Sequence, residues 1–403
     1  MKAVVIHHSL NTPGGEATLA IETIRSLHEL GYNVEFVTVQ KPNLEDIEKV
    51  YAKKIPVSNV KSLFPFKINC FGIYQRLLTS ISSLDLKDSD IVINTNGNTV
   101  PFGIPNDVPY MLYIHFPTLL MNSKGYNNNK YQKSFFWKAY FKPYHVMSNA
   151  LTKRALERSN VVLTNSRFSK DAVRKAYPKV VPYVLYPPIE IDRFSIAYRS
   201  NSRERQVLVI SRFSREKQIE KAIKIARILR ANIKFEVIGS LVPANRPYFN
   251  SLRKMIQENG LEGKIKLTPN ATNEELLSAM STSTIYLHTM YGEHFGVSIV
   301  EAMAAGLVPI VPSYGGCSEI VPFEYLYNTL EDAAACISKN IDEINSEKRE
   351  NIYNIAKQYS PARFRKMLQQ YVEQACNSNT NYNNNNNNKM AKQSAHHHRL
   401  PPR

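Results

Sequence analysis

Apolar residues recur along this chain with two alternating periods, which predicts β-strands separated by helices. Residues 2–40 show the pattern once: an apolar run, a helix whose apolar face repeats every three to four residues up to Gly31, and a second apolar run. That helical face is formed by Ala17, Ala20, Ile21, Ile24 and Leu27. Further apolar runs predict strands at 91–94, 110–114, 161–164, 206–210, 234–238, 264–268, 285–288 and 307–311.

Helices are expected between these strands. The clearest one spans 217–230, and Thr272 with Glu275 has the spacing of a capping box at the start of another. Strands that alternate with helices imply parallel, doubly wound sheets. The rhythm breaks at a Pro-containing stretch near 186–204 and then restarts. We therefore expect an α/β protein with two Rossmann-like domains that face each other across a cleft.

The expected domain boundaries follow from these breaks in the pattern. The first domain would span 1–186, the linker 187–204 and the second domain 205–357. A last helix at 358–376 would pack back on the first domain. The Asn-rich stretch 377–403 has too few apolar residues to build a core, so we expect a disordered tail.

Composition narrows the class of protein. The chain has 403 residues, 43% of them hydrophobic and 21% charged, as in globular proteins. Its four scattered cysteines show no C-x-x-C spacing, which argues against a disulfide framework or zinc site and suits a reducing cytosol. The opening residues lead directly into a strand, so we expect no signal peptide. No apolar run reaches the roughly 18 residues of a membrane-spanning helix.

The formal net charge of +17 is unevenly spread. Residues 51–200 carry 21 Lys and Arg against 8 Asp and Glu, whereas residues 301–350 carry 3 against 9. One lobe is therefore expected to face something anionic. A nucleic acid is one such partner, but a binding stripe for nucleic acid would not explain the acidic residues discussed below.

Segment 121–158 concentrates this basic character. It carries eight Lys and Arg, one acid and eight aromatic residues. Aromatic rings at headgroup depth with basic side chains on anionic lipid are typical of an interfacial helix. The expected membrane surface comprises Lys130, Lys133, Trp137, Lys138 and Lys142. The alternative is an internal helical hairpin with aromatic residues in the core and solvated lysines.

Charged residues follow the carboxyl ends of strands in the second half, where doubly wound sheets bind ligands. Arg212 and Lys217 follow strand 206–210 and suit a diphosphate, although a solvated turn would have the same sequence. Glu293 precedes a helix start, itself an anion site, and Glu301 lies inside that apolar helix. Both carboxylates would be satisfied by ligand hydroxyls. Alternatively, Glu293 caps the helix and Glu301 pairs with a basic neighbour.

Several motifs resemble those of glycosyltransferase family 4, the retaining enzymes of GT-B fold. "EHFGVSIVE" is similar to the family's E-x7-E signature, "ISRFSREK" to its phosphate-binding R-x4-K, and "NTPGGEA" to its first glycine-containing loop. "VVLTNSRFSKDAV", "VLYPPIEIDRF" and "YGGCSEIV" also resemble family segments, so that the likeness covers about residues 1–375. The first loop has fewer glycines than its relatives, which leaves its contacts open.

The resemblance implies a role for individual residues. Arg212 and Lys217 would bind the donor diphosphate, Glu293 the donor sugar and Glu301 the ribose. His115 would lie at the reaction centre. The remaining donor-binding residues would be Gly14 and Gly15 in the first loop and Gly296, Val297 and Ser298 at the helix start. The nucleotide sugar would be a co-substrate, and neither a metal nor another cofactor would be needed. "DSD" at 88–90 precedes a strand, so we interpret it as a polar turn.

Two stretches, "LHTMYGEHFG" and "YIHFPTLL", most resemble the α-1,2-mannosyltransferases of this family that extend a lipid-linked oligosaccharide. Those enzymes use GDP-mannose on the cytosolic face of a membrane. The resemblance thus implies a peripheral membrane protein of the cytoplasm with a nucleotide-sugar donor, a lipid-linked glycan acceptor and no nucleic-acid partner. The nearest alternative is a transferase of the same fold that uses a soluble sugar acceptor.

Overall fold

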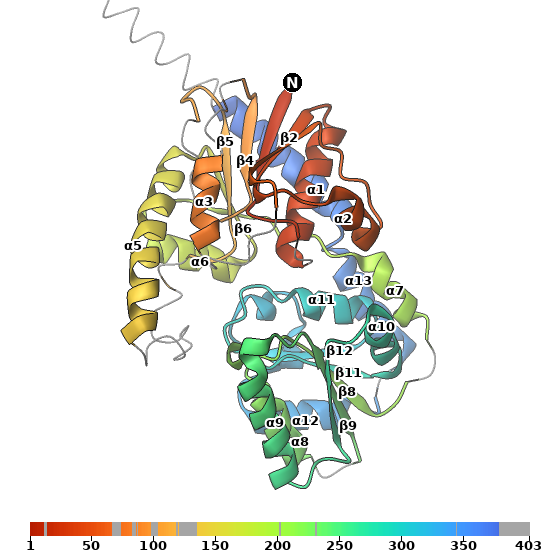
Figure 1. Cartoon of the computed structure of the whole chain (residues 1–403). Helices are drawn as coiled ribbons and strands as arrows, with labels where there is room; N and C mark the ends of the chain where they lie inside the picture. Colours follow the sequence, from red (N-terminus) through yellow and green to blue (C-terminus); the bar gives the residue numbers. More distant parts are fainter. Residues whose placement is uncertain are drawn as a thin grey trace, which may run out of the picture.

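A computed structural model shows two α/β halves that follow each other along the chain (Figure 1). It describes residues 1–11, 14–66, 74–82, 86, 88–97, 104–117, 120, 135–200, 203–229, 232–343 and 345–378, without the side chains of 82 and 135–138. Within these residues, none of the helices is both long and apolar enough to span a membrane. The low-complexity tail predicted for 377–403 lies outside the description from residue 379 onward.

The first half contains a seven-stranded, wholly parallel sheet with the order β3-β2-β1-β4-β5-β6-β7. The order reverses between β1 and β4, which defines the topological switch point of a doubly wound sheet. The strands in chain order are β1 (Lys2–Ile6), β2 (Asn33–Gln40), β3 (Asn59–Phe64), β4 (Ile91–Asn94), β5 (Tyr110–Ile114), β6 (Val161–Thr164) and β7 (Tyr183–Val184).

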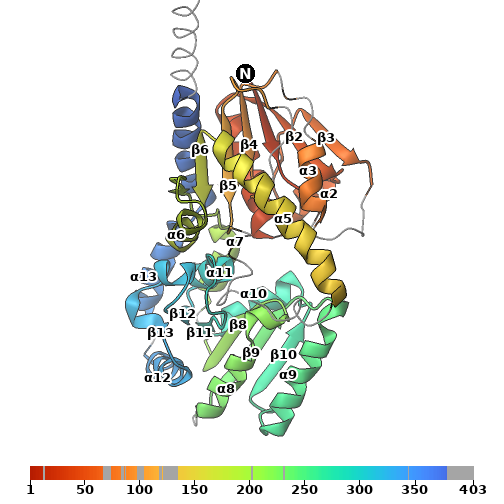
Figure 2. The same cartoon turned by 90° about the vertical axis from the view of Figure 1, so that its left-hand side faces the viewer.

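Helices cover both faces of this sheet because successive strand residues point to opposite sides. Along β1, Ala3 and Val5 belong to one core and Val4 and Ile6 to the other. The helices of this half are α1 (Gly15–Glu29), α2 (Leu44–Tyr51), α3 (Gln75–Ser82), α5 (Phe135–Arg158) and α6 (Arg167–Ala176). Figure 2 shows α5 crossing obliquely in front of the sheet.

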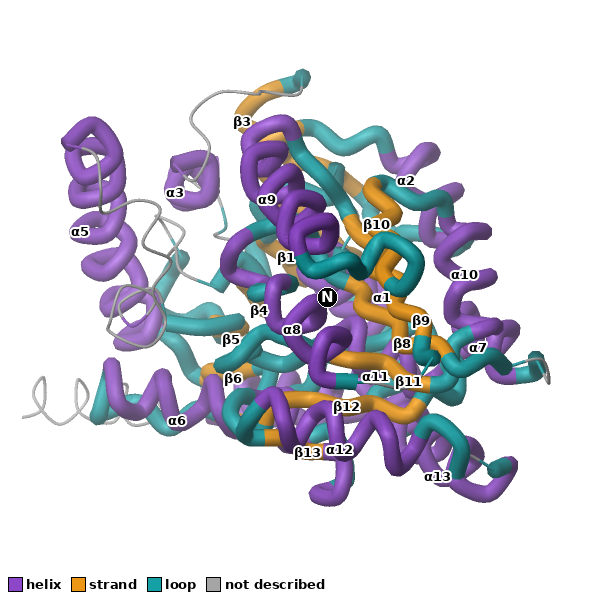
Figure 3. Tube along the Cα trace, turned by 90° about the horizontal axis from the view of Figure 1, so that it is seen from below, coloured by secondary structure: helices purple, strands orange, loops and turns teal. Residues whose placement is uncertain are grey.

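The second half repeats this architecture with a six-stranded parallel sheet of order β10-β9-β8-β11-β12-β13. Its strands are β8 (Gln206–Ile210), β9 (Lys234–Gly239), β10 (Ile265–Pro269), β11 (Ile285–Leu287), β12 (Val308–Pro312) and β13 (Leu326–Tyr327). Viewed from below, α8 (Glu220–Ile228) and α9 (Arg246–Glu258) lie on the near side of this sheet (Figure 3). The other helices are α7 (Ile191–Tyr198), α10 (Asn273–Thr282), α11 (Val297–Ala304), α12 (Leu330–Asn340) and α13 (Ser346–Lys357).

The predicted alternation of strands and helices is confirmed, with a few differences. The strands predicted at 264–268, 285–288 and 307–311 are shifted or shortened by one residue. The helix predicted to begin at 217 begins at Glu220, because Lys217 belongs to a 3-10 turn and Gln218 adopts a left-handed φ of 54°. The capping box of Thr272 and Glu275 is present.

The stretch expected as a linker is not an extended connection. It contains α7, whose Ile191, Phe194 and Ala197 belong to the core of the second half. After α13 the chain returns, and the helix over 361–378 places Phe364 and Leu368 in a core of the first half. Both views show this terminal helix, in blue, beside the first sheet (Figures 1 and 2).

An ionic network holds the two segments that connect the halves, α7 and the helix over 361–378. The carboxylate of Glu22 on α1 is buried and accepts hydrogen bonds from Lys53 (2.8 Å) and from Arg365 of the terminal helix (2.5 Å). Lys53 also pairs with Glu190, the N-cap residue of α7. A buried carboxylate needs such partners, so the network ties the first half to both segments that cross to the second.

Candidate active site

A largely buried Lys217–Glu293 ion pair lies at the carboxyl ends of the strands in the second half. Lys217 ends the 3-10 turn Arg215–Lys217 after β8, and Glu293 lies in the loop after β11. Lys217 Nζ donates a hydrogen bond to Glu293 Oε2 at 2.7 Å, and both side chains are less than one-fifth exposed. The sequence predicted both residues as ligand contacts. In the structure their charges neutralise each other.

The surroundings of Glu293 keep it ionised. Burial alone would raise the pKa of its carboxyl, but the charge of Lys217 and the neighbouring His288 hold that pKa well below its usual range. His288 Nε2 lies 3.3 Å from Glu293 Oε2. Burial lowers the pKa of His288, so this imidazole is neutral near pH 7.

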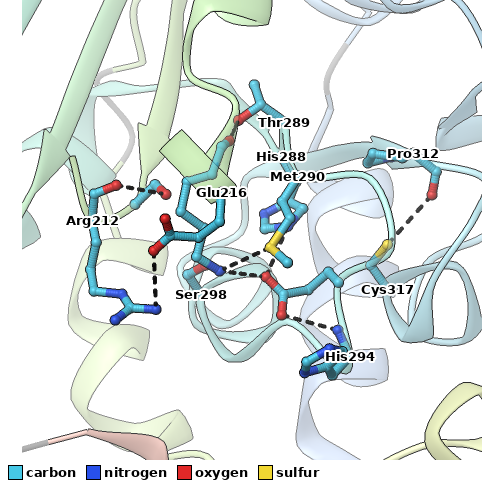
Figure 4. Close-up of polar contacts among 12 residues, drawn as sticks. Arg212, Glu216, His288, Thr289, Met290, His294, Ser298, Pro312 and Cys317 are labelled. Carbon is cyan, nitrogen blue, oxygen red and sulfur yellow. Dashed lines mark hydrogen bonds and ion pairs between the residues drawn. The ribbon is translucent and has the colours of Figure 1, made fainter. Parts of the chain in front are cut away.

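Backbone contacts fix the loop that carries Glu293. Gly316 N donates to Glu293 O at 2.7 Å, and His294 N donates to the Glu293 carboxylate at Oε1, 3.1 Å away. Thr289 Oγ1 donates to Lys217 O at 2.7 Å, so the loop is also bonded to the turn that carries its ion-pair partner (Figure 4). The position of the Glu293 carboxylate is therefore set by the strand ends around it.

The start of helix α11 provides free backbone donors beside this pair. Its N-cap is Gly296, whose φ of 110° is strained for any other residue, and no side chain in the described part of the chain caps the helix. The alternative in which Glu293 caps α11 is therefore wrong. Ser298, expected beside the donor, has its hydroxyl 2.8 Å from Tyr286 OH.

The glycine loop of the first half meets this helix start. A Cβ atom on Gly15 would lie 3.0 Å from Val297 Cγ2, so the close approach favours glycine there. Gly14 donates its backbone N–H to Tyr51 OH at 3.1 Å. Both glycines thus lie at the face between the halves, opposite the N-terminus of α11.

Glu301 lies one turn further into α11 and is half-buried. Burial raises the pKa of its carboxyl to about 7, and the charge of Arg193 opposes this shift only in part. Among the residues that the structure describes, none forms a hydrogen bond or close ion pair with this carboxylate. The alternative pairing of Glu301 with a basic neighbour therefore finds no partner there.

Arg212 lies apart from this group. Its side chain is 67% exposed, and among the described residues it forms an ion pair with Glu216 alone, at 3.8 Å. In Figure 4 it stands away from His288, Met290 and His294, with Glu216 between them. The expected contact of Arg212 with a diphosphate therefore requires its exposed side chain to turn toward Lys217.

His115 follows β5 in the first half. Its Nε2 lies 3.1 Å from the carbonyl oxygen of Thr95, so Nε2 carries the proton and Nδ1 is left as an acceptor. Burial lowers the pKa of His115. The imidazole is thus a neutral hydrogen-bonding group near pH 7.

Sequence reasoning missed the direct contacts between the two halves. Ser166 Oγ donates to His294 O at 2.6 Å, and the His294 ring stacks on Phe116 with centroids 3.9 Å apart. The Glu319 carboxylate accepts the backbone N–H groups of Arg167 (2.8 Å) and Phe168 (2.6 Å) at the start of α6. Only the acidic residue in "YGGCSEIV" could have signalled the last of these contacts.

The predicted membrane surface falls partly outside the description. Lys130 and Lys133 lie outside the described residues, as do the side chains of Trp137 and Lys138. Lys142 is exposed on α5, next to exposed Val146 (64%) and Met147 (50%). Tyr144, by contrast, is buried against the first half. From residue 135 onward the segment is one helix rather than a hairpin.

Two family models match adjacent parts of the chain. One, described as Glycosyltransferase Family 4, matches residues 13–193, and the other, Glycosyl transferases group 1, matches residues 190–359. Together the two matches span residues 13–359, so the chain consists of a part similar to family 4 glycosyltransferases followed by a part similar to group 1 glycosyl transferases. The R-x4-K and E-x7-E residues all lie within the second match.

Curated relatives are about one-quarter identical to this chain over the aligned residues. The GDP-Man:Man(3)GlcNAc(2)-PP-Dol alpha-1,2-mannosyltransferase of Dictyostelium discoideum is 23% identical over 67% of this chain and 60% of its own length. The alpha-1,3/1,6-mannosyltransferase of Schizosaccharomyces pombe is 27% identical over 80% and 69%, respectively. The chain spans 53% to 60% of the length of the alpha-1,2-mannosyltransferases of Dictyostelium, Candida glabrata and Neurospora crassa.

Solved structures confirm the GT-B fold. Anabaena HepE in complex with UDP and glucose has a TM-score of 0.64 at 16% identity, covering 93% of this chain and 99% of that one. The sucrose-phosphate synthase of Thermosynechococcus elongatus has a TM-score of 0.67 at 15% identity, with the same coverage. At such identities the likeness concerns the fold alone.

The ion pair generates a prediction about stability. Lys217→Ala should leave the Glu293 carboxylate buried without its cation, at a cost of about 3 kcal/mol. Arg212→Ala removes an exposed partner and should cost less than about 1 kcal/mol. Calorimetry of the second domain's unfolding should therefore separate the two variants, with the exposed Lys224→Ala as a control. Equal melting temperatures for Lys217→Ala and Lys224→Ala would contradict this account of the pair.

Proposed function

We propose that the chain is a retaining glycosyltransferase that moves mannose from GDP-mannose to a lipid-linked oligosaccharide. The observation that carries this proposal is the Lys217–Glu293 pair beside the uncapped start of α11. A diphosphate that bound there would take Lys217 and the helix N–H groups, which would release Glu293 to bind sugar hydroxyls. The names of the relatives support the choice of donor sugar and acceptor.

The residues of the site suit a transfer without a metal ion. Negative charge grows on the diphosphate as its bond to the anomeric carbon breaks, and Lys217, Arg212 and the α11 N–H groups would stabilise it. The acceptor hydroxyl would attack on the face from which the diphosphate leaves and give its proton to the leaving phosphate oxygen. His115, neutral and anchored on Thr95, would orient the hydroxyls at the reacting carbon.

The first test is a screen of nucleotide sugars by thermal shift. GDP-mannose at about 100 times its dissociation constant should stabilise the protein by about 2.7 kcal/mol, whereas UDP-glucose should have a smaller effect. Transfer to a lipid-linked trisaccharide analogue would then be measured, with the anomeric configuration of the product determined by NMR. Stabilisation by no nucleotide sugar, or an inverted product, would refute the proposal.

Glu301 should make donor binding depend on pH. Its carboxyl has a pKa of about 7, and only the ionised form offers all its lone pairs to the two ribose hydroxyls. Donor binding therefore favours the deprotonated carboxyl, so the affinity for the donor should rise with pH. Between pH 6 and pH 8 it should increase by up to about ten-fold. Glu301→Gln should bind more weakly and lose this dependence. Calorimetric titration with GDP-mannose would measure both; a Gln variant with the wild-type pH profile would assign the titration to another group.

We further propose that α5 docks the protein on an anionic membrane surface, where a lipid-linked acceptor would be reached. The outer side of α5 combines Lys142 with exposed Val146 and Met147, around a groove of about 440 Å³ that Ala139 and Pro143 also line. Apolar side chains at the lipid boundary and basic ones at the headgroups are the two requirements of interfacial binding.

The membrane proposal predicts that Val146→Asp/Met147→Asp abolishes flotation with phosphatidylserine vesicles. Lys142→Glu should weaken it, since each basic residue at such a surface contributes about 1 kcal/mol. Val181→Asp, which changes an equally exposed valine elsewhere in the first half, is the matched control. Transfer to a short water-soluble acceptor should survive in all three. Flotation that persists in the double variant would show that the membrane surface lies elsewhere.

A further inference from the structure

A chain of polar side chains connects the start of α11 with the Glu293 carboxylate. Ser298 Oγ lies 2.8 Å from Tyr286 OH, and this hydroxyl lies 3.2 Å from His288 Nδ1. On the other edge of the ring, His288 Nε2 lies 3.3 Å from Glu293 Oε2. Tyr286 and His288 are 0% and 4% exposed, so the middle of the chain is shielded from bulk water. We call these four residues the polar chain.

Backbone contacts hold His288 in a fixed place at the end of β11. His288 N donates to Ile310 O at 2.9 Å, and Tyr327 OH donates to His288 O at 2.8 Å. Lys217, by contrast, reaches Glu293 from the end of a flexible four-carbon stem. Of the two groups beside the carboxylate, the lysine is therefore the one that can turn to another anion.

The Glu293 carboxylate decides which nitrogen of His288 carries the proton. Burial lowers the pKa of His288, so the ring is neutral and has a single N–H. With the proton on Nδ1, the lone pair of Nε2 would face the negative charge of Glu293. With the proton on Nε2, that nitrogen donates to the carboxylate and Nδ1 accepts from Tyr286. Tyr286 gives its single proton to His288, and its oxygen accepts from Ser298.

The contact between His288 and Glu293 is incomplete while Lys217 is paired. Lys217 Nζ holds the same carboxylate oxygen, Oε2, at 2.7 Å, and 3.3 Å to His288 Nε2 is long for a hydrogen bond. Nε2 is buried, and the part of the chain that the structure describes offers it no other hydrogen bond. A buried N–H of this kind is costly to leave unpaired, so it would attract a carboxylate that Lys217 releases.

We propose that His288 is the second partner of Glu293 and takes over its carboxylate when a diphosphate binds Lys217. Tyr286 and Ser298 are positioning residues, because they keep the proton of His288 on the nitrogen that faces Glu293. This inference rests on the proposed transferase function and adds how the site exchanges one charge partner for another. Without His288, Glu293 would retain Lys217 and compete with the donor, since a buried carboxylate needs a partner.

GDP isolates this exchange, because it brings a diphosphate but no sugar for Glu293. His288→Leu removes the second partner, so the affinity for GDP in calorimetric titration should fall about ten- to hundred-fold, as expected for a hydrogen bond to a charged group. The affinity for GDP-mannose should fall less, because the sugar hydroxyls offer Glu293 other partners. His288→Gln should bind GDP nearly like the wild type, since its amide N–H can replace that of Nε2.

Two controls separate this effect from damage to the fold. Glu293→Gln has no carboxylate that competes for Lys217, so adding His288→Leu to it should leave the affinity for GDP unchanged. His28→Leu changes an exposed histidine on α1 and should bind GDP like the wild type.

The binding data can overturn the inference in distinguishable ways. If His288→Leu weakens GDP equally with and without Glu293→Gln, it acts through the structure and the inference is wrong. Wild-type affinity of His288→Leu for GDP would also overturn the inference and leave the proposed transferase function standing. A wild-type protein that binds neither GDP nor GDP-mannose would refute both.

The direction of the polar chain can be measured without a ligand. Nitrogen-15 NMR distinguishes protonated from free imidazole nitrogens, and His288→Gln identifies the signals of this ring among those of the ten histidines. Nε2 should carry the proton, and Tyr286→Phe should shift the signal of Nδ1. Saturating GDP should move the Nε2 proton signal downfield as its bond to Glu293 shortens. A proton on Nδ1, or an Nε2 proton that does not respond to bound GDP, would overturn the inference.

Discussion

A carboxylate that is removed from water must have a cation or hydrogen-bond donors, and in the second half of this chain Glu293 obtains them from Lys217. This requirement joins two loops that follow different strands, β8 and β11. The hydrogen bond from the Thr289 hydroxyl to Lys217 O and the bridge between Glu293 and Gly315 hold the same loops in place. The ion pair therefore fixes the geometry of the site, and the proposed diphosphate would compete with Glu293 for Lys217.

The loop that carries Glu293 also makes the contact with the first half. His294, the next residue, stacks on Phe116 and accepts the Ser166 hydroxyl through its carbonyl. Glu319 reinforces this contact by occupying the N-terminus of α6, where its charge is favourable. A change in the position of Glu293 would therefore also act on the contact between the halves. If the donor binds Glu293 as proposed, its binding would be coupled to the approach of the two halves through one backbone step.

Much of the fold was predictable because its strands are buried on both faces. The run at 206–210 is apolar throughout, as a parallel strand between two layers of helices requires. Strand β3 escaped prediction because its residues at the sheet edge are only half-buried, and β7 and β13 have two residues each, too few for a period. For the site, the sequence indicated the charged residues after each strand. It could not indicate that Lys217 and Glu293, 76 positions apart, pair with each other.

At the face that they share, the second half presents positively charged groups and the first half presents groups that are neutral or balanced in charge. The second half offers cations and helix N–H groups, because a leaving diphosphate carries negative charge. The first half offers neutral imidazoles and the oppositely charged pair of Glu16 and Arg76. Part of the formal charge of +13 in residues 51–200 lies instead on α5, where Lys142, Lys153 and Arg154 are exposed. These three charges are therefore available to the surroundings of the protein.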